Sequence, residues 1–155
     1  MTGSPLRRPL AVVVLALALA GCSQTNPIQT DHPYSASDGV RVVLGDVRAE
    51  NLLAVTSGAG AAGALSGALV NSAASDIPVT LTVGDSSEKV TVPARGSVLI
   101  GTGSDTGQHV PVPTVSAAPG ALLDVTISTP QAGTVHVQVP VRDAANPQYT
   151  GVVGG

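Results

Sequence analysis

Apolar and polar residues alternate along much of the chain. The alternation is clearest in residues 135–141, where a valine occupies nearly every second position. Successive side chains of a β-strand point to opposite faces of a sheet, so this pattern predicts a strand with one buried and one solvated face. Val137 and the valines two residues away on either side should face the core, and His136 should face solvent.

Several further runs alternate in a similar way and are separated by turn residues such as Gly84-Asp85-Ser86-Ser87. In residues 46–50 the charged side chains all fall on one of the two faces. Many short strands with turns between them predict an all-β protein, an antiparallel sandwich. The alternating runs are residues 46–50, 79–83, 90–92 and 123–127, and residues 40–44 and 96–100 are expected to add further strands.

Residues 57–70 break the alternation because they consist largely of glycine and alanine. The segment could be a loop followed by a strand, or a short helix. Gly63 and Gly67 would each destabilise a helix by up to about 1 kcal/mol relative to alanine. We therefore expect a loop and then a strand over residues 64–70.

Residues 1–21 have the three parts of a secretory signal peptide: a basic pair at Arg7-Arg8, an apolar run over residues 10–20, and small residues before Cys22. A transmembrane helix needs about 20 apolar residues, and this run is shorter. The sequence Leu19-Ala20-Gly21-Cys22 resembles a bacterial lipobox. The resemblance implies that Cys22 is acylated and becomes the first residue of the mature chain, so we expect a lipid anchor on the extracytoplasmic face of the cell membrane.

Changes in composition divide the rest of the chain into three parts. Residues 22–39 are polar and contain prolines, so they are expected to form a flexible tether. Residues 40–142 contain the alternating runs and are expected to form the β-sandwich domain. Residues 143–155 are rich in turn-forming residues and are expected to be a disordered tail.

Composition limits both the core and the partners. Hydrophobic residues make up 43% of the chain and charged residues 11%, which excludes a charged disordered protein. The only aromatic residues are Tyr34 and Tyr149, so the core must consist of aliphatic side chains. A net charge of −3 argues against nucleic acid as a partner, because that needs clustered Lys and Arg. Cys22 is the only cysteine, so no disulfide forms within the chain.

Gly58, Gly60 and Gly63 match the G-x-G-x-x-G fingerprint of dinucleotide-binding proteins, and Asp76 lies about where a ribose-binding acid would. That fingerprint works only between a parallel strand and a helix. The residues that follow alternate as strands, so we expect no nucleotide cofactor. The sequence contains no Gly-x-Ser-x-Gly elbow, so nothing in it points to a hydrolase, and we expect no enzyme activity.

Three segments of the second half resemble the PCuAC copper-chaperone family, whose fold is an Ig-like, cupredoxin-like β-sandwich. They are residues 92–99, 107–111 and 131–142. The first contains a proline-glycine turn before a strand, and the last contains an Ala-Gly-x-Val run that leads to Val-Pro-Val. Residues 67–71 are also similar to the LpqE-like branch of actinobacterial envelope lipoproteins. The resemblance implies an Ig-like/cupredoxin-like sandwich over roughly residues 40–142.

The family binds Cu(I) with methionine and histidine side chains, because a soft cation prefers thioether ligands. At the family's His-x-Met position this chain reads His109-Val110-Pro111, and the other methionine position, near residues 66–68, has small side chains. Met1 is the only methionine and lies in the signal peptide. His109 is the one candidate metal ligand that remains, and we expect no copper cofactor. His32, in the tether, and His136 are expected to be solvated side chains.

These observations predict one of two functions. The first is a lipid-anchored, non-enzymatic lipoprotein that binds or scaffolds an unidentified protein of the cell envelope. The alternative is a degenerate extracytoplasmic metal-binding protein that uses His109 together with neighbouring Asp or Glu side chains.

Overall fold

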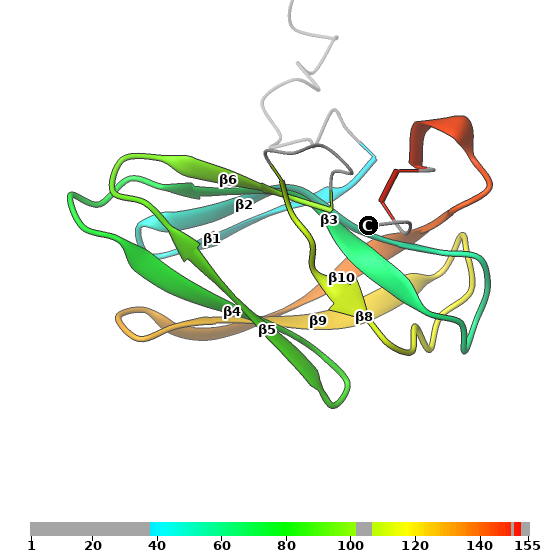
Figure 1. Cartoon of the computed structure of the whole chain (residues 1–155). Coiled ribbons are helices and arrows are strands. Elements are labelled where there is room, and N and C mark those ends of the chain that lie inside the picture. The colour runs from blue at the N-terminus through cyan, green and yellow to red at the C-terminus, as the bar shows by residue number, and fades with distance from the viewer. Residues whose placement is uncertain (1–37, 102–106, 150, 153–155) are drawn as a thin grey trace, which may run out of the picture. The chain divides into compact units, whose positions relative to one another are not determined.

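The computed structural model describes residues 38–101, 107–149 and 151–152. The chain divides into two compact units, Met1–Tyr34 and Ser35–Gly155, and all of the described residues belong to the second. In the described residues this unit consists of strands and a short 3-10 helix (Figure 1). The elements are β1 (Val40–Leu44), β2 (Val47–Thr56), β3 (Gly63–Asn71), β4 (Ile77–Val83), β5 (Ser86–Val92), β6 (Ser97–Ile100), β7 (Gly107–Gln108), β8 (Pro111–Val112), β9 (Leu122–Thr129), β10 (Gly133–Asp143) and η3 (Pro147–Tyr149).

The strands form two layers that face each other (Figure 1). One layer contains β5, β4, β9 and β10 in that order, and the other contains β1, β2, β3, β6, β7 and β8. β10 joins the layers, because it runs antiparallel to β9 as far as Pro140 and then parallel to β2 from Val141 to Asp143. The predicted all-β sandwich is confirmed. Among the described strands, only the β10–β2 and β6–β7 pairs are parallel.

Alternating side chains from the two layers fill the space between them. In β4 and β9 every second residue is buried. The main core cluster is aliphatic, as the composition required, and its largest fully buried members include Leu52, Leu65, Leu81 and Ile127. Burying one such side chain contributes about 1.5–3 kcal/mol, so many moderate contacts hold this core without an aromatic anchor.

The predicted pattern of residues 46–50 is also confirmed. Val47 and Ala49 are buried, whereas Arg48 and Glu50 lie on the outer face of β2. The Glu50 carboxylate is 3.1 Å from the Arg41 guanidinium and 3.3 Å from that of Arg48. These partly exposed ion pairs contribute little to stability, so the buried side chains set the register.

The register predicted for the last strand is confirmed. Val139 is fully buried, Val137 is half-buried against the core cluster, and His136 is exposed. His136 lies opposite Thr126 of β9, with its Nδ1 atom 2.9 Å from the threonine hydroxyl. The imidazole therefore belongs to the solvated outer face of this layer.

This register predicts unequal effects of two neighbouring truncations. Val137→Ala should lower the free energy of unfolding by about 1–2 kcal/mol, because it removes methyl groups packed on the core. His136→Ala should cost less than about 0.5 kcal/mol, because its ring is exposed. Denaturant melts of the two variants measure both values. Equal losses would contradict the register.

The glycine- and alanine-rich segment forms a loop followed by a strand, as predicted. The buried Thr56 hydroxyl donates a hydrogen bond to the Ala62 carbonyl (3.0 Å) and closes the loop. β3 begins at Gly63, where a Cβ atom would collide with the Val55 carbonyl oxygen, so the close approach to β2 requires glycine. The G-x-G-x-x-G match thus lies in the loop of an antiparallel β-hairpin and leads into a strand instead of a helix.

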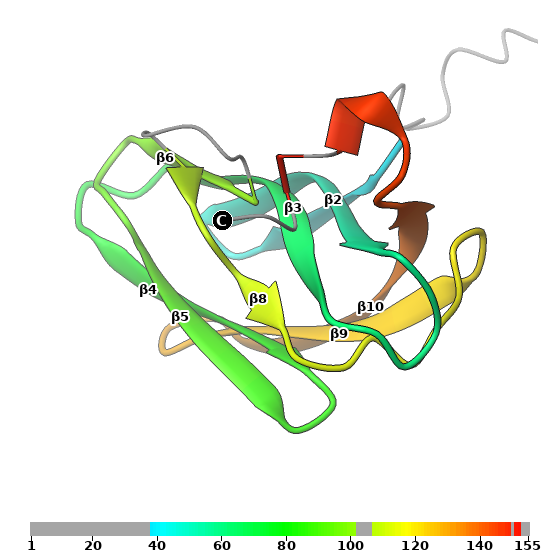
Figure 2. The same cartoon turned by 45° about the vertical axis from the view of Figure 1, so that its right-hand side comes forward.

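The described residues of the C-terminal segment, 143–149 and 151–152, are folded, whereas a disordered tail was predicted over residues 143–155. η3 follows β10, and the segment packs on the outer face of β2 and β3 (Figure 2). The cause is the apolar run at the end of β2, where residues 52–55 are all buried. Side chains on both faces of that strand therefore need a cover. The cluster that provides it comprises Leu53, Val55, Ala64, Tyr149 and Val152.

The start of the domain also differs from the predicted boundary at residue 40. Gly39 is buried and its N–H donates to the side-chain oxygen of Asn51 (2.7 Å), and Asp38 binds the C-terminal segment. The last two residues of the predicted tether are thus part of the domain. Cys22, His32 and the signal peptide lie outside the described residues. Within the described ranges there is no helix with the length and apolar character of a membrane span.

Candidate functional site

His109, the metal ligand suggested by the PCuAC resemblance, lies beside β3. The Leu65 N–H donates to the Val110 carbonyl (3.0 Å), and Pro111 is paired with Ala64. Beyond this pairing the register changes, because Gly101 lies against Leu65 and Ser66 and its N–H donates to the Gln108 carbonyl (3.0 Å). His109 therefore lies between β7, which pairs with β6, and β8, which pairs with β3.

The positions that the PCuAC resemblance assigns to a copper site carry no soft-metal ligands. His109 is exposed, Pro111 has no side-chain donor atom, and Ser66 offers a hydroxyl in place of a thioether. The described residues contain no group of three or more His, Cys, Asp or Glu side chains that could hold a metal ion. The thioether ligands of the family are therefore missing at the positions that the resemblance assigns to them.

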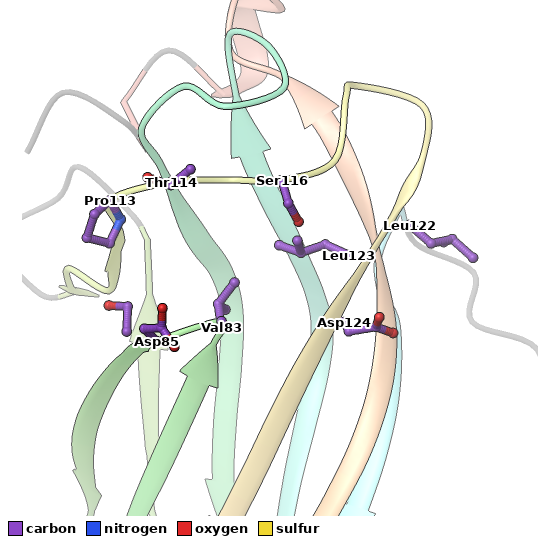
Figure 3. A pocket seen from close by; sticks show the side chains of 10 residues that line it. Val83, Asp85, Pro113, Thr114, Ser116, Leu122, Leu123 and Asp124 are labelled. Atoms are coloured by element: carbon purple, nitrogen blue, oxygen red, sulfur yellow. The ribbon is translucent and has the colours of Figure 1, made fainter.

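An open groove of about 730 Å³ lies at one end of the sandwich (Figure 3). Its volume falls in the range of small-ligand sites, about 300–1,000 Å³. Three segments form it: the β4–β5 turn, the connection from β8 to β9, and the start of β9. The residues that line it are Val83, Gly84, Asp85, Ser86, Pro113, Thr114, Ser116, Leu122, Leu123 and Asp124.

Local backbone geometry places the groove residues. Gly84 has φ +55°, as the first position of a two-residue type II′ hairpin requires, so Asp85 projects at the tip of the β4–β5 turn. In the facing connection Val115 is fully buried, and its N–H and C=O bond to the Ala61 carbonyl (2.9 Å) and the Gly60 N–H (2.7 Å). These two hydrogen bonds hold Val115 in the interior, and the flanking residues, Thr114 and Ser116, are exposed.

The groove has an apolar floor and a polar rim. Val83 and Leu123 are buried, and Figure 3 shows them on either side of the space, with the Ser116 hydroxyl pointing toward it. Leu122 and Asp124 face the other way, across β9 (Figure 3). The Asp124 carboxylate accepts a hydrogen bond from the Gln138 side chain (3.1 Å) there, and Leu122 is 56% exposed.

The electrostatics of the groove are one-sided. Asp85 is the carboxylate on its rim, and none of the lining residues is Lys, Arg or His. The ion pairs found in the described part of the chain involve Glu50 and Asp38, not Asp85. A ligand that enters the groove therefore meets hydroxyl groups, an apolar surface and the Asp85 carboxylate, with the Asp124 carboxylate directed across β9.

A second polar cluster joins the two ends of the domain. The Tyr149 hydroxyl donates to Asp38 Oδ2 (2.6 Å), and the Gln148 side chain donates to the same oxygen (3.1 Å). The Arg142 guanidinium donates to the Asp38 carbonyl (2.9 Å) and is 3.6 Å from its carboxylate. The Tyr149 and Gln148 hydrogen bonds, followed by the charge of Arg142, hold the pKa of Asp38 below its usual value. Burial, followed by the bond to Asp38, raises the pKa of Tyr149.

Sequence analysis identified neither the groove nor this cluster. The sequence contained one signal for the groove. Leu122-Leu123 interrupts the alternation at the start of a strand, so one of the two leucines, Leu122, is exposed to solvent. The other groove residues sit in turns, whose positions in space depend on strand pairing. Tyr149 is the one aromatic residue in the described ranges. Because it lies in the segment predicted to be a disordered tail, the sequence did not indicate that it packs on the sandwich.

The fold is one that known structures share. It is a β-sandwich of the PCuAC type, as comparison with solved structures shows. The copper-bound PCuAC domain from PmoF2 superimposes with a TM-score of 0.52 and 18% sequence identity, covering 67% of this chain and 98% of that domain. The apo form of the same domain gives a TM-score of 0.53 at 18% identity, covering 68% of this chain and 97% of that one.

A second PCuAC domain gives the same result. The apo domain from PmoF1 has a TM-score of 0.52 and 14% identity, with 67% of this chain and 99% of that domain covered. At these identities the likeness establishes the fold alone. No protein-family model matches the chain, and no curated protein sequence does.

Proposed function

We propose that this chain is an actinobacterial envelope lipoprotein of the LpqE-like branch, in which a PCuAC-like sandwich serves as a non-enzymatic binding or scaffolding domain. Cys22 carries the lipid, and residues 23–37 connect it to the domain on the extracytoplasmic face of the membrane. The observation that carries the proposal is the sequence Leu19-Ala20-Gly21-Cys22 behind a signal-like apolar run.

The anchor explains why the chain has a single cysteine. A thiol that is acylated after export needs no partner cysteine, and the rest of the chain contains none. Each buried methylene of an acyl chain contributes about 0.8 kcal/mol, so two or more chains on one cysteine hold a protein of this size at the bilayer without a spanning helix.

The domain supports binding better than catalysis. The groove at the end of the sandwich has the size of a ligand site, with an apolar floor and a few hydroxyl groups. The lining residues include the carboxylates of Asp85 and Asp124, of which Asp124 bonds to Gln138, but no histidine or cationic side chain, so they provide no carboxylate–histidine pair for acid–base catalysis. A site of this kind positions a ligand without providing groups that react with it.

A copper or other metal-binding function is the second candidate, because the fold resembles that of a copper-bound PCuAC domain and the sequence resemblance assigns His109 to the family's His-x-Met position. One exposed imidazole provides one borderline ligand, so any metal bound there is held weakly. This candidate and the first make opposite predictions for Cu(I), which are compared in the Discussion.

Substitution of Cys22 tests the anchor. In cells given a clickable fatty acid, the wild-type chain should be labelled and sediment with membranes. Cys22→Ala should lose the label completely, because no other thiol is available, and should no longer be held by lipid. Ser23→Ala is the matched control and should behave as wild type. Labelling that persists in Cys22→Ala would disprove acylation at this residue.

A further inference from the structure

The groove at the end of the sandwich has an apolar surface and a polar surface close to each other. Val83 and Leu123 form the apolar part, and the hydroxyls of Thr114 and Ser116 line the facing wall (Figure 3). An apolar ligand would leave these hydroxyls without the water that now solvates them, and a fully polar ligand would gain nothing from the floor. The lining therefore fits an amphiphile.

The charge of the rim selects among amphiphiles. Asp85 projects from the tip of the β4–β5 turn, and no cationic side chain lies among the groove residues. A carboxylate without an ion pair favours a protonated amine and disfavours an anionic head group. Asp124 adds to the negative potential from the other side of β9, although its side chain bonds to Gln138.

The segment that leads into β9 and the groove is bonded to β10, which in turn binds the first described residue. The Val141 N–H donates to the Ala121 carbonyl (2.9 Å), next to the groove residue Leu122, and the neighbouring Arg142 binds Asp38 (2.9 Å). The residues before Asp38 lead back to Cys22. With the lipid anchor proposed above, the domain is kept close to a bilayer, where amphiphiles are found.

We propose that this groove binds a small amphiphile that carries a protonated amine, with its alkyl body on Val83 and Leu123 and its ammonium group at Asp85. Only the membrane as the source of this ligand rests on the proposed function. The ligand chemistry rests on the groove itself.

Three probes with the same alkyl chain test the proposal: octylammonium, octanol and octanoate, each below its micelle concentration. The protein is the whole mature chain, residues 22–155, with Cys22→Ser so that no lipid competes for the groove. Binding is followed through the backbone amide signals of the groove residues in NMR titrations. Octylammonium should bind about threefold tighter than octanol, the gain typical of an exposed charge pair, and octanoate should bind most weakly.

Two variants with matched controls locate the site. Asp85→Asn should abolish the preference for octylammonium over octanol, whereas Asp46→Asn, at the same place in the Gly45-Asp46 hairpin turn, should keep it. Ser116→Trp should fill the groove and prevent binding of all three probes. Ser97→Trp, at an exposed position on β6, should not.

Four outcomes would overturn the proposal. They are equal binding of octanol and octylammonium by the wild type, preferred binding of octanoate, unchanged binding in Ser116→Trp, and groove signals that move with protein concentration alone. The last would indicate a second copy of the chain as the occupant. None of these results bears on acylation of Cys22, so the two proposals fail separately.

Discussion

Tyr149→Ala should lower the free energy of unfolding by about 3 kcal/mol, the largest loss expected from one substitution on the outer face of the sandwich. Its ring is 9% exposed and is the one aromatic group that packs on Leu53, Val55 and Ala64. Removing it leaves a cavity beneath the C-terminal segment and uncovers apolar side chains of β2. Denaturant melts followed by circular dichroism measure the loss.

Tyr149→Phe separates the ring from the hydroxyl. This variant keeps the apolar contacts and loses only the hydrogen bond to Asp38, so its loss of stability should be clearly smaller than that of Tyr149→Ala. A loss in Tyr149→Ala below that of a typical surface substitution, about 0.5 kcal/mol, would show that the C-terminal segment is not packed in solution.

The same cluster predicts a dependence on pH. The pKa of Asp38 lies below its ordinary value of 3.8 in the folded state, because Tyr149, Gln148 and Arg142 stabilise the carboxylate. The stability it contributes is therefore present above the ordinary pKa and is lost as the pH falls through the lowered folded value. The difference in stability between wild type and Asp38→Asn should be constant near pH 7 and disappear in acid. A difference that grows in acid would contradict this assignment.

The second large effect concerns copper. The mature wild-type chain should leave Cu(I) with a competing high-affinity chelator, because it has no methionine, and its one sulfur atom is thioether-linked to lipid if the proposed anchor is correct. A competition titration measures the fraction of Cu(I) captured. Stoichiometric capture that is lost in His109→Ala would favour the metal-binding alternative.

The PCuAC resemblance allows the complementary gain-of-function test. Pro111→Met and Ser66→Met introduce thioethers at the two places where that resemblance expects methionine. The double variant should capture Cu(I) from the chelator, and adding His109→Ala should remove that gain. Failure of the double variant to bind any Cu(I) while remaining folded would show that this place in the fold cannot support the site.

Period-two alternation was sufficient to predict most of the sandwich. It located the strands at residues 79–83, 123–127 and 135–141, because one face of each is buried and the other is solvated. It also gave the correct orientation of His136. The same rule could not describe the end of β2, since residues 52–55 are apolar on both faces and the pattern there has no period.

The parts that sequence analysis missed depend on contacts between distant residues. Asp38 and Tyr149 are 111 residues apart in the sequence. The parallel pairing of β10 with β2 brings the two ends of the domain together. The groove likewise joins a hairpin tip at Asp85 to the connection around Ser116. Pro and Gly near these residues indicated turns, but turn residues alone do not reveal which turns meet.

The central claim is that a PCuAC-like domain is held at the membrane through Cys22. Intact-mass spectrometry of the protein purified from its own membranes tests this claim most directly. The account predicts a chain that begins at Cys22, with a mass above that of residues 22–155 by the mass of a lipid, and an N-terminal peptide that carries the entire increase. A free Cys22 thiol, or a mature N-terminus far from residue 22, would contradict it.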